Sequence, residues 1–175
     1  MSDTTHPRPD DTEYASFYAG YVASVPDGDI VDVLRAGGAA LGAALPAIPQ
    51  ARAGYRYAEG KWSVCEVIGH MIDAERIFTY RILRIARGDQ TPLASFDQDV
   101  YVRTAGSDAR TIAGLAAEMV ALRASTLLLL ESLPAASWSN RGTASEKPVS
   151  VRALAYITVG HAQHHLNVLH ERYGA

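Results

Sequence analysis

Residues 62–82 read WSVCEVIGHMIDAERIFTYRI and carry the clearest helix signal in this chain of 175 residues. Ser63 is followed three residues later by Glu66, which is a capping box: the Ser63 hydroxyl accepts a backbone N–H bond, and the Glu66 carboxylate accepts one from the cap residue's amide. The apolar residues that follow keep the i, i+3, i+4, i+7 spacing of a core face, at Val64, Val67, Met71, Ala74, Phe78, Ile82 and Ile85. The sequence therefore predicts a helix from Ser63 to about Arg87, with Gly88 as its stop.

Three further helices are predicted on either side of this one, over residues 29–45, 111–133 and 150–173. Prolines end the first two, and the third has a cap at Ser150 and Gly174 just past its end. The first contains three glycines, each costing about 1 kcal/mol against alanine in a helix, so they either permit close packing or weaken the helix. No segment shows the alternation of a strand, and the fold class predicted is all-α, a four-helix bundle.

The remaining segments are shorter or less regular. Residues 1–12 are polar and contain two prolines, so we expect a disordered or loosely docked arm before a single domain over residues 13–175. Residues 13–25, EYASFYAGYVASV, predict a short amphipathic N-terminal helix. Residues 89–110 form a long connection whose segment FDQDVYV, residues 96–102, reads as a short strand or a packed loop.

Composition narrows the class of protein. With 48% hydrophobic and 20% charged residues, the chain has the profile of one ordinary soluble domain. Its net charge of −3 disfavours nucleic acid or an anionic membrane as partner, and no run approaches the ~18 uninterrupted apolar residues of a membrane helix. Cys65 is the single cysteine and is assigned no role. The first residues lack the order of a secretory signal, so we expect a cytoplasmic protein.

Two histidines fall in the middle of the apolar face of the last predicted helix. They are His161 and His165, one turn apart, whereas His164 lies at the edge of that face and His170 lies opposite. A single histidine on such a face is most often a hydrogen-bonded core residue. A pair must find polar partners or lose about 1–3 kcal/mol through desolvation, and a divalent cation satisfies both lone pairs at once.

His70, on the helix predicted over residues 63–87, is the natural third ligand. The connection over residues 89–110 could span ~65 Å, more than the ~35 Å length of a 23-residue helix, and can therefore cross the whole bundle. In the resulting up-down-down-up order, with a long crossover between helices two and three, His70 lies seven residues from the start of its helix and His165 eight from the end of its own. An up-down-up-down order would offset them by about 6–12 Å, so we favour the crossover.

The same residues resemble the DinB/YfiT-like family of small helical metalloproteins. The resemblance is carried by residues 62–82, with Trp62, His70, Asp73 and Glu75, by HAQHH at residues 161–165, and by ALRASTLLLLESL around Arg123; it covers about Tyr55 to Tyr173. Family membership implies a four-helix bundle that holds one divalent metal ion, zinc, nickel or iron, through His70, His161 and His165. It also implies a hydrolase, or an enzyme that transfers a low-molecular-weight thiol such as bacillithiol or mycothiol to a small-molecule substrate, and frequent homodimers.

Three imidazole ligands leave an open coordination position, which is the pattern of catalytic rather than structural metal sites. Water or a thiolate would occupy that position. A di-iron centre is disfavoured because no Glu-x-x-His pair occurs. The alternatives are a non-catalytic metal or small-ligand binding bundle and a structural module with metal-free histidines.

Carboxylates near the predicted site have two interpretations. Asp73 and Glu66 neighbour His70 and could orient its imidazole, but solvated charges on the helix surface are the more common case. Asp97, Asp99 and Tyr101 in the long connection could line a substrate pocket, because long connections in compact domains are often functional.

Overall fold

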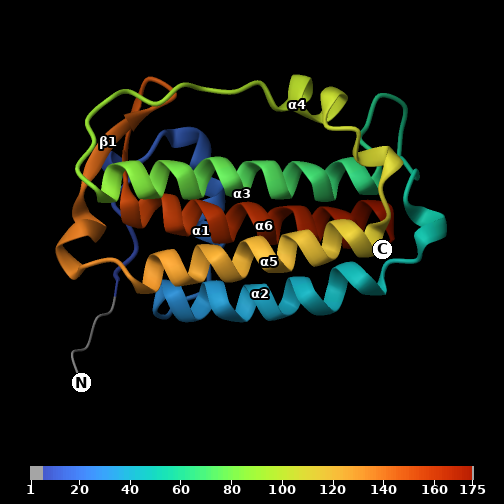
Figure 1. Ribbon diagram of the computed structural model, residues 1–175, viewed down its shortest axis with the longest axis horizontal. Coiled ribbons are helices and arrows are strands. Elements are labelled where there is room, and N and C mark those ends of the chain that lie inside the picture. Colours follow the sequence, from blue (N-terminus) through green and yellow to red (C-terminus); the bar gives the residue numbers. More distant parts are fainter. Residues whose placement is uncertain (1–5, 175) are drawn as a thin grey trace.

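Four long helices lie side by side in the computed structural model, which describes residues 6–174 (Figure 1). They are α2 (Ile30–Ala47), α3 (Val64–Ala86), α5 (Ile112–Glu131) and α6 (Val151–Tyr173). The predicted four-helix bundle is confirmed, and the predicted ends of all four helices agree with the observed ones to within two residues. Each helix begins at a side chain that accepts backbone N–H bonds: Asp29, Ser63, Thr111 and Ser150.

The order of the helices is up-down-down-up, as predicted. Figure 1 shows α2 and α6 running in one direction and α3 and α5 in the other, with the connection between α3 and α5 crossing the length of the bundle. α6 is therefore antiparallel to α3, which it contacts extensively. This arrangement places the beginning of α3 beside the end of α6, where the histidines of both helices lie.

Part of the long crossover is a helix, which corrects the prediction of a strand or packed loop over residues 96–102. α4 (Gln98–Thr104) begins at Asp97, whose carboxylate accepts bonds from the amides of Asp99 (2.9 Å) and Val100 (3.1 Å). Only Val102 of this helix is buried. A helix of two turns with one buried side chain has no apolar period, so the cap was the signal to be found in the sequence.

The second correction is a β-hairpin in a segment for which the sequence predicted no strand. β1 (Arg141–Ala144) pairs antiparallel with β2 (Lys147–Ser150). Its two turn residues, Ser145 and Glu146, have φ angles of 53° and 63°. Tight hairpin turns of this kind usually contain Asn-Gly or Asp-Gly, so the sequence here carries no turn signal.

The predicted N-terminal helix is shorter than the amphipathic stretch that indicated it. α1 (Ala19–Ser24) follows two 3-10 turns, Asp11–Glu13 and Ser16–Tyr18, and packs on α6. The contact requires Gly160, because a Cβ there would overlap the backbone carbonyl of Tyr21. Further 3-10 turns occur at Gln50–Arg52, Ser107–Ala109 and Ala135–Ser139.

Residues 1–5 of the predicted arm lie outside the described residues. Within residues 6–12, His6 and Arg8 contact the rest of the fold. The His6 ring stacks on Trp138 with 3.7 Å between the ring centroids, and Arg8 donates to the carbonyl of Val25 (2.7 Å). These contacts join the start of the described chain to α1 and to the turn before the hairpin.

A buried ion pair joins α3 to α5. The Arg123 guanidinium donates from Nε to Glu75 Oε1 (2.8 Å) and from Nη2 to Oε2 (2.7 Å), and Thr126 Oγ1 donates to Oε1 (2.9 Å). Gly38 of α2 lies against the Arg123 side chain, where a Cβ would be 3.0 Å from Cγ. The glycines of α2 therefore permit close packing, the first of the two explanations that the sequence left open.

By length and composition alone, α2 and α5 are apolar enough to span a membrane. Core helices of soluble proteins meet the same criterion. In this chain α2 and α5 pack on each other, and α5 holds the Arg123 charge against Glu75 of α3.

We expect Arg123→Met to lower the free energy of unfolding by about 3–5 kcal/mol, because Glu75 would remain buried without its cation. The double variant Glu75→Met, Arg123→Met should recover most of that loss. Arg76→Met, which breaks a pair between Arg76 and Glu118 with a half-exposed arginine, should cost about 0–1 kcal/mol. Urea unfolding measures all three, and equal losses in the two single variants would contradict the assignment.

Candidate metal centre

The structure brings together the three histidines that the sequence singled out. His70 of α3 and His161 of α6 lie with their Nε2 atoms 3.0 Å apart, and one ring nitrogen from each of His70, His161 and His165 lies within 4.8 Å of the others. His70 and His161 are 4% and 7% exposed, and His165 is half-buried. His164 and His170 are exposed and do not belong to the cluster.

Helix geometry explains why these three side chains meet. His161 and His165 are one turn apart on the face of α6 that is turned to α3, and the antiparallel direction of the two helices places His70 at their level. Aromatic rings surround the cluster: Trp62 lies against His70 with 4.8 Å between centroids, and Phe78 lies against His161 with 5.6 Å. His70 and His161 are therefore largely shielded from water.

Burial keeps the imidazoles uncharged. Desolvation lowers the pKa of His70 to about 4, although the negative charge of Asp99 acts in the opposite direction. Desolvation, together with the neighbouring His70 and His164, lowers the pKa of His165 to about 3. Burial, together with the other histidines, lowers the pKa of His161 well below its usual value. At neutral pH each ring has a free lone pair, as a metal ligand requires.

The donor set fits a divalent metal ion. Two nitrogen ligands at 2.0–2.1 Å from a tetrahedral zinc are ~3.3 Å apart, close to the separation of the His70 and His161 nitrogens. Without a metal, one of these two rings can donate a hydrogen bond to the other, but Nδ1 of His165 is buried with no hydrogen-bond partner among the described residues. An ion bound by all three rings would use the one lone pair that each uncharged imidazole offers.

The carboxylates beside His70 differ in what they contact. Glu66 completes the capping box at Ser63 (2.8 Å) and pairs with Arg56 (2.5 Å), so it acts on the start of α3 rather than on an imidazole. Asp73 is half-buried, burial raises its pKa, and within residues 6–174 it has no hydrogen bond to a histidine. Sequence proximity to His70 was therefore a poor guide to function for both residues.

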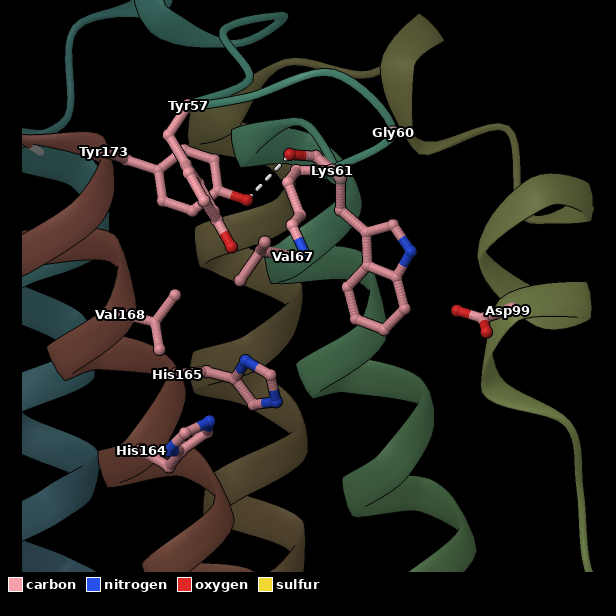
Figure 2. A pocket seen from close by; sticks show the side chains of 10 residues that line it. Tyr57, Gly60, Lys61, Val67, Asp99, His164, His165, Val168 and Tyr173 are labelled. Atoms are coloured by element: carbon pink, nitrogen blue, oxygen red, sulfur yellow. Dashed lines mark hydrogen bonds between the residues drawn. The ribbon is translucent and has the colours of Figure 1, made fainter.

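A cavity of about 440 Å³ opens on the His165 side of the cluster (Figure 2). Figure 2 shows Asp99 on α4 facing this space from the side opposite to α6, and Tyr57 and Lys61 reaching into it from the loop before α3. Asp99, in the segment that the sequence had linked to a pocket, is its carboxylate. The residues lining it are Tyr57, Gly60, Lys61, Trp62, Val67, Asp99, His164, His165, Val168 and Tyr173.

A second cavity, of about 210 Å³, reaches the other side of the cluster. Aromatic side chains from the N-terminal segment and the crossover form much of its wall. The sequence did not predict these residues as part of the site, although the aromatic-rich stretch over residues 13–25 was a signal. The lining residues are Phe17, Tyr18, Tyr21, His70, Ala74, Phe78, Phe96, Gln98, Ser145 and His161.

The fold and the cluster define a class: an up-down-down-up bundle with three histidines from two antiparallel helices. The profile of the DinB superfamily matches residues 34–169, and the chain belongs to that superfamily. No curated protein matches it.

Among the solved structures that share the fold are the following two. One is YfiT from Bacillus subtilis, described as a probable metal-dependent hydrolase with an unusual four-helix bundle topology; it is 18% identical, with a TM-score of 0.73 over 97% of this chain and 94% of that one. The other is a mycothiol-dependent maleylpyruvate isomerase, 14% identical, with a TM-score of 0.67 over 79% of this chain and 58% of that one.

We expect the metal-free protein to lose stability as the pH falls from about 6.5 to about 4. The unfolded chain takes up protons on its histidines below pH 6.5, whereas the folded chain holds His70 and His165 neutral down to their depressed pKa values, so acid favours unfolding by up to about 1.4 kcal/mol per pH unit for each histidine. Urea midpoints measured in EDTA across this range test the expectation. His70→Gln should flatten the profile and His170→Gln, at an exposed site, should not; parallel profiles for all three proteins would contradict it.

Proposed function

We propose that this protein is a mononuclear divalent-metal enzyme that acts on a small molecule, by hydrolysis or by transfer of a low-molecular-weight thiol. The observation that carries the proposal is the cluster of His70, His161 and His165, uncharged, partly orphaned and flanked by two cavities. Three protein ligands leave a coordination position for an exchangeable group. A purely structural site would have no need of a cavity at the cluster.

The residues around the cluster suggest how a substrate is received. His70, His161 and His165 would hold the metal ion, which supplies Lewis acidity and lowers the pKa of a water or thiol in its open position. Asp99 faces the larger cavity and is placed to accept a proton from a substrate bound there. The rings of Trp62 and Phe78 lie against His70 and His161 and keep water from these two imidazoles.

The comparisons support both reaction classes. The fold neighbour YfiT is described as a probable metal-dependent hydrolase, and the second neighbour depends on the thiol mycothiol. Zinc, nickel and iron all accept imidazole ligands, so the donor set leaves the identity of the metal open. We further propose a homodimer acting in the cytoplasm.

We expect the purified protein to bind one equivalent of Zn²⁺ or Ni²⁺, and His161→Ala to weaken binding more than the ~10–100-fold typical of losing an outer-shell partner. His170→Ala is the matched control, since it removes an exposed imidazole from the same helix. Elemental analysis after dialysis and calorimetric titration measure the effect. Equal metal retention by the two variants would contradict the ligand assignment.

Activity is tested on metal-loaded protein with two panels, one of esters and amides and one of thiol conjugations to electrophiles. We expect turnover in one panel, lost in His161→Ala and kept in His170→Ala. Asp99→Asn should lower kcat while leaving the metal content unchanged. Bound metal without turnover in either panel would instead indicate the non-catalytic metal-binding bundle.

A further inference from the structure

Arg81 of α3 is a buried cation without a counter-ion among residues 6–174. The side chain is 3% exposed, and its Nη2 donates to the carbonyl of Ala94 (2.8 Å) and to Ser145 Oγ (3.0 Å). Both acceptors are neutral, and within residues 6–174 no carboxylate oxygen lies within 4.0 Å of the guanidinium. Arg123 of α5 is also a buried arginine, but both oxygens of the Glu75 carboxylate accept hydrogen bonds from it.

A buried charge is normally paired, because desolvation of an isolated ion costs several kcal/mol. The two neutral acceptors use only Nη2 of Arg81, so the planar fork of its guanidinium has donors left for a ligand. A carboxylate is the group that matches this fork in shape and charge.

Arg81 lines a cavity of about 270 Å³ whose walls are mainly apolar. Lys147 contributes a second cation, and no Asp or Glu of the described chain lines the space, so its charge favours an anion with an apolar body. Phe17, at the edge of this cavity, is 76% exposed and available to cover a ligand. The lining residues are Ala15, Phe17, Tyr18, Arg81, Ala144, Ser145, Lys147, Pro148, Val149 and Leu154.

This cavity adjoins the one that reaches the histidines. Phe17, Tyr18 and Ser145 line both spaces, so Ser145 accepts a bond from Arg81 and also borders the cavity of His70 and His161. Eleven residues separate Arg81 from His70 on α3, which places both on nearly the same face, ~16 Å apart along the helix axis. A ligand held at Arg81 would extend between the aromatic walls toward the metal centre.

We propose that Arg81 binds the carboxylate of a small apolar acid, with the rest of that molecule lying in the aromatic cavity that leads to His161. The claim that such an acid binds at Arg81 depends only on the charge and shape of the Arg81 cavity. The claim that the acid is the substrate rests on the proposed function.

Arg81 also holds the hairpin turn to the crossover, through Ser145 and Ala94. That structural role predicts a loss of stability on substitution but no preference of the protein for carboxylates. The test therefore begins with the unaltered protein.

The experiment is an NMR titration of methyl-labelled protein with 3-phenylpropanoate and, separately, with its neutral amide, 3-phenylpropanamide. Val149 and Leu154 in the cavity wall report binding. We expect the carboxylate to bind at least ten times more tightly than the amide in EDTA-treated protein. Arg81→Gln should abolish that preference, and Arg87→Gln, which removes an exposed cation at the end of the same helix, should keep it.

Equal binding of acid and amide to the unaltered protein would overturn the proposal even if Arg81→Gln fails to fold. Acid binding that requires added zinc and disappears in His161→Ala, but not in Arg81→Gln, would also overturn it, since the acid would then bind the metal; the proposed function would survive that result. Acid binding at Arg81 in a protein that binds no metal would reject the proposed function and leave the anion site standing.

Discussion

The centre of this molecule is a set of imidazoles that a helix interface has removed from water. His70 and His161 face each other at 3.0 Å, and burial keeps both uncharged at neutral pH. The cluster forms because α3 and α6 are antiparallel and at the same level, and in this chain the crossover between α3 and α5 makes them so. The crossover also supplies Asp99 to the cavity beside His165. The helix order, the histidine cluster and the cavity beside it therefore all depend on the crossover between α3 and α5.

Buried polarity is distributed unevenly over the faces of α3. Toward α5 the helix carries Glu75, whose charge is fully matched by Arg123. Toward α6 it carries His70, whose lone pair is available, and near its end Arg81, whose charge is unmatched among the described residues. A matched pair holds helices together, whereas unmatched groups beside cavities are available for ligands. On this one helix, the polar group that holds the fold together is paired, whereas the polar groups proposed to bind ligands form no ion pair among the described residues and lie beside cavities.

The close contacts near the site depend on residues with little or no side chain. Gly160, next to His161, allows α1 to lie directly on α6 and brings Tyr21 over the His161 ring. The exposed Phe17 and the aromatic residues that follow it thus reach the cavity from a segment far from α6 in sequence. The N-terminal segment completes the wall of a site whose histidines belong to α3 and α6.

The sequence by itself determined the four helices, because caps such as Ser63 with Glu66 and a 3.6-residue apolar period are local properties. It also selected His70, His161 and His165, since a helical wheel and counts along each helix need no tertiary contact. Only the tertiary structure decided that Glu66 pairs with Arg56, that Arg123 meets Glu75, and that Arg81 lies beside a cavity with no counter-charge from the described residues. The hairpin turn at Ser145 and Glu146 also had to be seen, because its backbone conformation is imposed by strand pairing and not by the residue types. Whether a buried charge is paired depends on atoms distant in sequence, and no local pattern records it.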